Sequence, residues 1–456
     1  MNAVIYLAGV VVFVVAMLAS IGLHELGHMI PAKRFGGKVT QYFIGFGPTV
    51  WSRQRGETEF GLKAIPLGGY VKIVGMLPPE AAELADEVTV DAQGNTVTKV
   101  RKSNTGLFTQ LISDARAAEW ELVGPEDTGR LFYKMPWWKK VIVMAGGPTV
   151  NILIAFFVFW ALFATYGQAG AAEPKPGPPV VNEVSRCVVP WNEEGRECTA
   201  DDKASPAYEA GLRPGDVITT FNGVEVSSWD QLRVLIRSNA DGAAEIGWLR
   251  DGEAMSGTTN TTVELRPTGD DIDDENLKAV GFLGVTPETT VPITKGGPLY
   301  TVQQMGHMTV DTVQAMASLP GKVWGVAKAI VGVEERAPDS PVSIVGGGRI
   351  SGEVASSDDL QLGEKVAVLA SIIGGFNFFI GMFNFIPLLP LDGGHIASAL
   401  WEAIRRGFAR LFGRPDPGYV DAAKLLPVAY VVASCLLVLS AVLIVGDIVV
   451  PVHLDS

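Results

Sequence analysis

Four apolar segments constrain the fold of this sequence more than any other feature. They lie at about residues 3–30, 141–166, 366–391 and 425–450. An α-helix rises about 1.5 Å per residue, so roughly 20 apolar residues cross the ~30 Å hydrocarbon core of a bilayer. Hydrophobic residues make up 48 % of the 456 residues and the mean hydropathy is +0.26. The sequence therefore predicts four transmembrane helices rather than a single soluble domain.

The first apolar segment has a second interpretation, a cleaved secretory signal peptide. No Lys or Arg precedes the segment, whereas a signal peptide begins with a positively charged region. A polar motif, "HELGH", also follows the apolar run without a spacer. Both observations disfavour cleavage, and we expect the segment to remain as the first transmembrane helix.

Lys and Arg residues predict the orientation of the chain in the membrane. They are concentrated in residues 31–140 and 392–424, and the two terminal tails contain none. Because short cytoplasmic loops carry an excess of Lys and Arg, both of these segments are expected in the cytoplasm. The sequence thus predicts a multi-pass protein of the cell membrane, with both termini and residues 167–365 outside the cytoplasm.

The remaining sequence divides into soluble or peripheral parts. Residues 31–77 are rich in aromatic and β-branched residues punctuated by glycine, which predicts a β-hairpin or small sheet beside the membrane. Residues 78–140 form a cytoplasmic insertion, polar and acidic from 78 to 130, and 167–177 a linker. Alternating strand patterns and one helix predict a compact domain at 178–290, followed by a helical region at 291–365.

Two cysteines lie in the predicted outer domain. Cys187 and Cys198 close the short loop "CVVPWNEEGREC", in a compartment that permits oxidation. We favour a disulfide between them over two free thiols. A metal site there is disfavoured because no histidine or further cysteine is near in the sequence.

The motif "HELGH" carries the chemistry of the first helix. His24 and His28 are four residues apart, so their imidazoles share one helix face, and Glu25 projects close enough to reach a metal-bound water. A chance match is the alternative interpretation. Three ionisable groups at the end of an apolar run are costly unless they form a site, which favours a metal site.

A catalytic zinc requires a third protein ligand. The metzincin pattern would supply a glycine and a histidine after His28, but Pro31 and Arg34 occupy those positions and exclude this class. Asp392 in "FNFIPLLPLDGGH" is the favoured candidate, because it follows the third apolar segment at the same cytoplasmic edge. His395 is a rival ligand, or a residue that supports the ligands from behind.

Together these motifs resemble the site-2 protease family of intramembrane zinc metalloproteases, and within it the bacterial regulator-of-sigma-E protease branch. "HELGH" and "NFIPLLPLDGG" carry the resemblance. "IGFGP" and "IPLGGYVKI" resemble the family's membrane-associated β-hairpin, "MAGGPTVNILIA" its second core helix, and "SPAYEAGLRPGDVITTFNGVEV" a PDZ domain. The resemblance implies a polytopic α-helical membrane protein with four transmembrane helices, a membrane-associated β-hairpin and an inserted extracytoplasmic PDZ (α+β) domain.

The resemblance also implies roles for individual residues. His24, His28 and Asp392 match the ligands of one Zn²⁺ per chain, and Glu25 matches the catalytic glutamate near the cytoplasmic face. Substrate contacts are expected from Asn384 and from the hairpin residues Gly45, Phe46, Gly47, Gly68, Gly69 and Tyr70. A bond between helices is the alternative for Asn384, and a plain structural hairpin the alternative for the others. Helix packing is the favoured role of Asn151.

The implied function is intramembrane proteolysis of single-span membrane proteins, such as anti-sigma factors after a first cut by an upstream site-1-type protease. Clearance of remnant signal peptides and processing of peptide precursors are alternatives, as is a non-catalytic membrane PDZ adaptor. The net charge of -13 provides no basic surface for nucleic acid. Two departures from the family stand out: only one PDZ signature is visible, and the insertion at 78–130 has no assigned counterpart.

Overall fold

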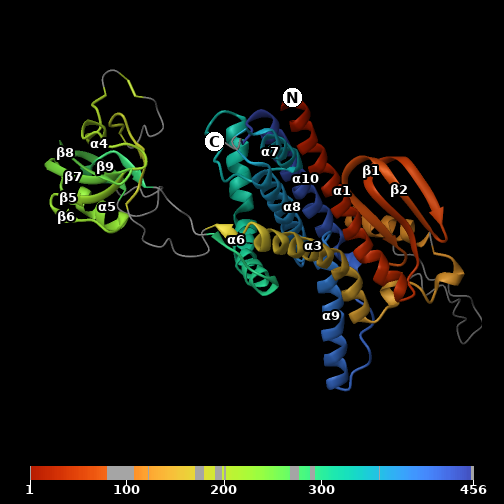
Figure 1. Ribbon diagram of the computed structural model, residues 1–456. Coiled ribbons are helices and arrows are strands. Elements are labelled where there is room, and N and C mark those ends of the chain that lie inside the picture. Colours follow the sequence, from red (N-terminus) through yellow and green to blue (C-terminus); the bar gives the residue numbers. More distant parts are fainter. Residues whose placement is uncertain are drawn as a thin grey trace, which may run out of the picture. The chain divides into compact units, whose positions relative to one another are not determined.

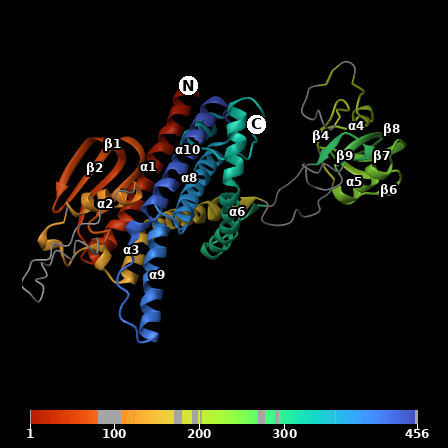
Figure 2. The ribbon, with the colours of Figure 1, turned by 180° about the vertical axis from the view of Figure 1, so that it is seen from behind.

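Figures 1 and 2 show the computed structural model, which describes residues 2–79, 107–121, 123–169, 179–190, 198–199, 202–267, 277–287, 293–358 and 360–452. The chain forms two compact units. Unit 1 comprises Met1–Tyr166 and Gly296–Ser456, and unit 2 comprises Gly167–Lys295. Unit 1 contains the long helices together with the hairpin, whereas unit 2 is a small mixed α/β body.

Four helices among the described residues are long and apolar enough to cross a membrane. They are α1 (Asn2–Arg34), α3 (Trp137–Thr165), α8 (Leu362–Asn384) and α10 (Leu426–Val449). Each contains most of one predicted apolar segment. The largest difference is at α8, which ends at Asn384 rather than near 391. Pro387 and Pro390 follow, and proline lacks the N–H that a continuing helix needs.

The predicted hairpin is formed by two long antiparallel strands, β1 (Val39–Arg55) and β2 (Thr58–Ile73). Both strands bend, so residues 41–44 pair with 59–62 and also with 69–72. The first part of β1 therefore lies between the two halves of β2. Gly45 and Gly47 lie at this bend with φ of +90° and +82°, a region that favours glycine.

The shorter helices of unit 1 complete the packing around the long ones. In the region predicted as helical, α6 (Pro298–Ile330) and α7 (Ile344–Ser356) are present. Met305 of α6 is buried against α3 and α8, and Val323 and Val326 are buried against α10. α7 packs on α1, where a Cβ at Gly9 would come 2.4 Å from the Ser351 carbonyl oxygen.

Two segments predicted as connections contain helices. The predicted cytoplasmic loop 392–424 begins with α9 (Asp392–Leu411), an amphipathic helix that packs on α3. The insertion at 78–140 contains α2 (Leu107–Trp120), two short 3₁₀ helices (Pro125–Asp127 and Phe132–Lys134) and the start of α3. Arg116 of α2 pairs with Asp421 at 2.5 Å. Residues 80–106 of this insertion lie outside the described part of the chain.

Unit 2 is built around a four-stranded sheet in the order β6-β5-β7-β8. These strands are Val224–Glu225, Val217–Phe221, Ala243–Arg250 and Glu253–Asn260. The predicted helix is α5 (Trp229–Ser238), whose Leu232 is buried with Ile218 and Ile246 in the core. The unit also contains α4 (Pro206–Glu209) and the strand pairs β4 (Val181–Val184) with β11 (Val285–Pro287), β9 (Thr262–Pro267) with β10 (Leu277–Phe282), and β3 (Gln168–Ala169) with β12 (Ile293–Thr294).

The loop that leads from β4 to α4 in unit 2 contains a disulfide. It joins Cys187 and Cys198, the two cysteines paired in the sequence analysis, with their Cα atoms 6.0 Å apart. Most of the predicted linker, residues 170–177, lies outside the described residues. The assignment of unit 2 to the PDZ class remains a prediction from the sequence.

Candidate metal centre

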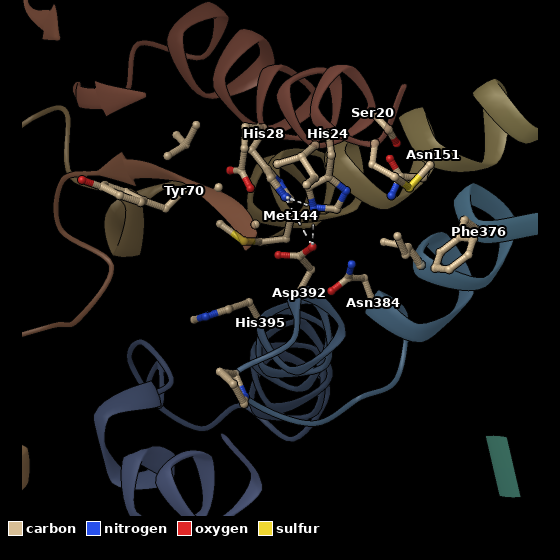
Figure 3. Close-up of a pocket in the computed structure, with 18 of the residues that line it drawn as sticks. Ser20, His24, His28, Tyr70, Met144, Asn151, Phe376, Asn384, Asp392 and His395 are labelled. Atoms are coloured by element: carbon tan, nitrogen blue, oxygen red, sulfur yellow. Dashed lines mark hydrogen bonds and ion pairs between the residues drawn. The ribbon is translucent and has the colours of Figure 1, made fainter. Parts of the chain in front are cut away.

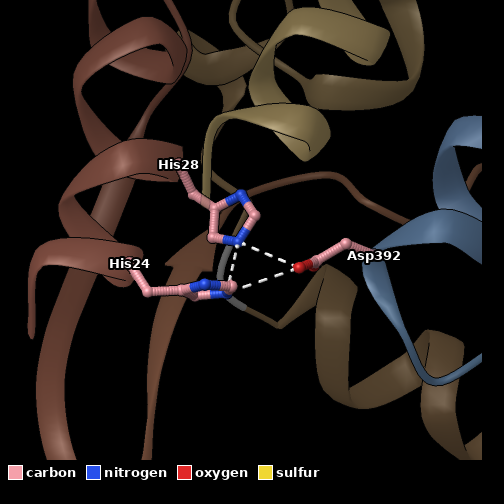
Figure 4. Close-up of side chains that lie close together, drawn as sticks. All are labelled: His24, His28 and Asp392. Atoms are coloured by element: carbon pink, nitrogen blue, oxygen red, sulfur yellow. Dashed lines mark hydrogen bonds and ion pairs between the residues drawn. The ribbon is translucent and has the colours of Figure 1, made fainter. Parts of the chain in front are cut away.

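The side chains of His24, His28 and Asp392 converge on one point from two helices (Figure 4). His24 and His28 are one turn apart on α1, and Asp392 is the first residue of α9. The two Nε2 atoms are 3.2 Å apart, and Asp392 Oδ2 lies 3.4 Å from Nε2 of His24 and 3.3 Å from Nε2 of His28. His28 and Asp392 are 364 positions apart in the sequence (392 minus 28), yet their side chains belong to one compact cluster.

This cluster has the geometry of a zinc site. Tetrahedral zinc with bonds of about 2.0–2.2 Å places its ligand atoms roughly 3.3 Å from one another, and the three observed separations match this value. Two imidazole nitrogens and one carboxylate oxygen are typical donors for a catalytic zinc, which keeps its fourth position open. Among the described residues, no other group of His, Cys, Asp or Glu has comparable ligand spacing.

Glycines bring α1 and α3 close together at the cluster. A Cβ at Gly27 would lie 2.5 Å from the carbonyl oxygen of Gly146, so the two backbones are in contact. A Cβ at Gly147 would lie 2.3 Å from Nε2 of His28 and 2.7 Å from Nε2 of His24. Only glycine leaves room for both imidazoles. No motif singles out Gly147 in the sequence, although paired glycines inside an apolar helix are a signal of close packing.

The cluster opens into a cavity of about 580 Å³, which we call the catalytic cavity. Its wall includes Glu25, Asn151 and Asn384 together with residues 68–71 of β2 (Figure 3). The structure therefore places Asn384, Gly68, Gly69 and Tyr70, four of the predicted substrate contacts, in the wall of this cavity beside the cluster. Gly45, Phe46 and Gly47 are not part of the wall. They lie on the neighbouring strand, where the Phe46 ring stacks on Tyr70 with centroids 6.3 Å apart.

His395 lies in the wall of the catalytic cavity but outside the cluster of ligand atoms. It is one turn after Asp392 on α9. Burial lowers the pKa of His395, so its imidazole is neutral at physiological pH. The geometry thus favours Asp392 over His395 as the third ligand.

Tyr42 fixes the hairpin to the helix that carries the motif. Its hydroxyl donates a hydrogen bond of 2.7 Å to the carbonyl oxygen of Gly22, two residues before His24. Burial raises the pKa of Tyr42 to about 12, so the hydroxyl keeps its proton at physiological pH. No sequence motif singles out Tyr42, because its partner is a backbone atom.

A buried ion pair holds α9 against α3. Lys140 Nζ lies 2.7 Å from Glu402 Oε2, and both side chains are at least nine-tenths buried. Glu402 Oε1 also lies 3.2 Å from the Arg406 guanidinium. Because Asp392 begins the same helix as Glu402, this pair contributes to the position of the third ligand.

Comparison with known proteins agrees with the geometry of the site. The family model described as peptidase family M50 matches residues 12–413. The zinc metalloprotease Rip1 of Mycobacterium tuberculosis is 32 % identical to this chain, over 98 % of this chain and 99 % of Rip1. Rip1 of Mycolicibacterium smegmatis is also 32 % identical over 98 % of each chain, and the regulator of sigma-W protease RasP of Bacillus subtilis is 25 % identical over 87 % of this chain and 90 % of RasP. With its four apolar helices, the chain is a multi-pass membrane protein that belongs to peptidase family M50, the site-2 proteases, which are intramembrane zinc metalloproteases.

Proposed function

We propose that this protease cleaves single-span membrane proteins inside the membrane, near its cytoplasmic face, with one zinc ion per chain. The observation that carries the proposal is the cluster of His24, His28 and Asp392 beside Glu25 in one cavity wall. Apolar helices form much of this wall, which suits a substrate that arrives from the lipid. Lys33 and Arg34 end α1 five and six residues after His28, which supports a cytoplasmic position for the site.

Glu25 is the proposed general base. His24, His28 and Asp392 would hold the zinc ion, which would act as a Lewis acid that lowers the pKa of water and polarises the scissile carbonyl. Glu25 is buried and follows His24 directly in the cavity wall, so its carboxylate can take a proton from the attacking water and pass it to the leaving amine. The Asn384 amide faces the same cavity and is the proposed donor to a substrate carbonyl.

The second half of β2 is the proposed binding edge for an unwound substrate. A helix satisfies its own backbone hydrogen bonds, so it has to unwind before it can be cut. Residues 69–73 pair with β1 along one edge, and no described strand pairs with their other edge. A Cβ at Gly69 would lie 3.1 Å from Glu25 Cγ, so glycine permits close approach. The substrate can then pair by β-addition beside the ligands, whereas Gly45, Phe46 and Gly47 shape the bend behind this edge.

The proposed topology places both termini and unit 2 outside the cytoplasm. Its support is the distribution of Lys and Arg, which are concentrated at 31–140 and 392–424. Unit 2 is proposed as a PDZ domain that screens the extracytoplasmic part of substrates. Its segment from Ser205 to Val226 carries the sequence resemblance, and the disulfide Cys187–Cys198 fits an oxidising compartment.

Anti-sigma factors are the proposed substrates, after a first cut by an upstream site-1-type protease. The relative RasP is named as a regulator of sigma-W protease, and this name supports a role in transcriptional signalling. Clearance of remnant signal peptides and processing of peptide precursors use the same chemistry and are the alternative outcomes. A non-catalytic PDZ adaptor is the alternative from another class.

The membrane proteome of cells that carry Glu25→Gln tests this proposal against cells with the native protein. We expect a truncated single-span protein to accumulate only in the variant, because glutamine cannot accept the proton. An accumulated anti-sigma fragment supports the signalling role, and accumulated signal peptides support clearance. Glu253→Gln, at an exposed site in unit 2, is the matched control and should match the native cells. Identical proteomes for native and Glu25→Gln cells would contradict proteolysis and favour the adaptor.

A further inference from the structure

Asn151 differs from an ordinary helix-packing asparagine. It is 1 % exposed on α3 and lies in the wall of the catalytic cavity. Its Oδ1 atom is buried and has no hydrogen-bond partner. A buried polar atom without a partner is unfavourable, so this acceptor is available to a donor from a neighbouring side chain of the cavity wall.

A matching unpaired group lies in the same cavity. Nδ1 of His24 is also buried and has no hydrogen-bond partner. Nδ1 of His28, in contrast, lies 2.8 Å from the carbonyl oxygen of Val143 on α3. A histidine that binds metal through Nε2 carries its proton on Nδ1, and this N–H is almost always donated to an acceptor. The structure provides that acceptor for His28 but leaves the position open at His24.

The packing of α1 against α3 places Asn151 near this open position. The two helices run antiparallel, since His28 contacts Val143, while Gly147 lies closest to both imidazoles. One turn beyond Val143 on α3 lies Gly147, next to both imidazoles, and Asn151 lies a further turn along, on the His24 side of the pair. Gly147 has no side chain to intervene. Figure 3 shows the side chains of Asn151 and His24 at the same end of the cavity.

Ser20, the next polar side chain along α1, is already paired. Its hydroxyl donates to Oδ1 of Asn377 on α8, and the Asn377 amide donates to the Ile373 carbonyl oxygen at 2.9 Å. Asn377 is fully buried with both ends of its amide bonded. It therefore packs helices together, the role that the sequence analysis favoured for Asn151. The amide of Asn377 is therefore satisfied by α1 and α8, whereas Oδ1 of Asn151 has no partner.

We propose that Oδ1 of Asn151 accepts the Nδ1–H of His24 when Nε2 of His24 binds zinc. Asn151 is then a positioning residue, which fixes the tautomer and the ring orientation of one ligand as the Val143 carbonyl does for the other. The spacing of "GGPTVN" follows from this arrangement. Gly147 clears space for the imidazoles, and one turn later Asn151 provides the acceptor. This inference rests on the proposed zinc site, but it concerns metal affinity rather than substrate.

This role can be tested on the full-length protein in detergent. Its zinc affinity is measured by competition with a chromophoric chelator. We expect Asn151→Ala to weaken zinc binding by about 10–100-fold, the usual effect of losing a partner behind a ligand. Asn151→Asp keeps an acceptor oxygen and should bind zinc within about threefold of the native affinity. The absorption bands of the Co²⁺ form should shift in Asn151→Ala and stay close to native in Asn151→Asp.

Asn377→Ala is the matched control, because it removes a buried asparagine whose amide is bonded to Ser20 on α1 and to Ile373 on its own helix. It should lower the thermal midpoint of the metal-free protein while zinc affinity stays within about threefold, as expected for a residue remote from the ligands. The inference is overturned if Asn151→Ala binds zinc like the native protein, if Asn151→Asp is as weak as Asn151→Ala, or if Asn377→Ala loses as much affinity. Native protein that binds no zinc would overturn the proposed function itself, a result distinguishable from these three.

Discussion

At the scale of single residues, the site depends on a few atoms whose positions tolerate little change. The three donor atoms are 3.2–3.4 Å apart, which is the spacing of a tetrahedral zinc site. Gly147 leaves just enough room for two of them. Substitutions here should therefore affect zinc binding before they affect the fold.

Asp392→Ala tests the choice of third ligand. We expect the purified variant to lose most of its zinc, because two histidines alone hold the ion weakly. His395→Ala should keep about one zinc per chain, because His395 lies outside the cluster. The metal content of the two variants, measured by mass spectrometry, decides whether Asp392 or His395 is the third ligand. Loss of zinc from His395→Ala with retention in Asp392→Ala would reverse the assignment.

Gly147→Ala tests the close packing behind the ligands. The added methyl would lie 2.3 Å from Nε2 of His28, so the imidazole has to leave its position. We expect proteolysis of a model substrate to fall by at least about 100-fold, the effect of a misplaced catalytic group. Gly375→Ala on α8 is the control, because a Cβ there meets nothing within 4 Å. Equal activity of the two variants would contradict this account.

At the scale of elements, two contacts tie the parts of the site to one another. Tyr42 fastens the hairpin to α1 next to His24, and the Lys140–Glu402 pair fastens α9, with Asp392 at its start, to α3. Both contacts are buried, so water does not compete for either hydrogen bond. The relative position of the ligands is therefore set by helix packing and not by the loops between the helices.

Glu402→Gln should destabilise unit 1, because it leaves the Lys140 ammonium buried without a counter-ion. Breaking such a pair costs about 3–5 kcal/mol, which should lower the thermal midpoint and the zinc content together. The double variant Lys140→Met with Glu402→Met should recover most of the loss. The exposed pair of Lys322 and Asp339 is the control, and Asp339→Asn should change stability by less than about 1 kcal/mol. A double variant as unstable as Glu402→Gln would show that charge burial is not the cause.

At the scale of the whole molecule, the chain combines two units with separate cores. Unit 2 has its own buried cluster and a disulfide, whereas the catalytic cavity is lined by residues of unit 1 alone. Each unit should therefore keep its fold when the other is perturbed. The proteolytic chemistry and the proposed substrate screening by unit 2 can then be changed independently.

Cys187→Ala with Cys198→Ala tests this independence. The disulfide closes a loop of about 12 residues, so its loss should destabilise unit 2 by roughly 3 kcal/mol. Zinc content should stay at the native level, because no ligand belongs to unit 2. Limited proteolysis with mapping of the cleavage sites measures both effects, and we expect new cleavages only within 167–295. Loss of zinc from this variant would show that the units are coupled.

The sequence by itself determined the apolar helices and named the candidate residues of the site. Hydrophobic length is a local property, so α1, α3, α8 and α10 could be read from composition, and helical periodicity puts His24 and His28 of "HELGH" on one face. The amphipathic pattern of α9 is also local, and the prediction of a loop there overlooked it. The bends of β1 and β2, in contrast, depended on pairing between residues far apart in the strands. Only the tertiary structure brought Asp392 to His24 and His28, separated Asn151 from Asn377, and placed Gly147 behind the imidazoles. These features depend on which side chains meet between packed helices, and no local pattern in the sequence records that.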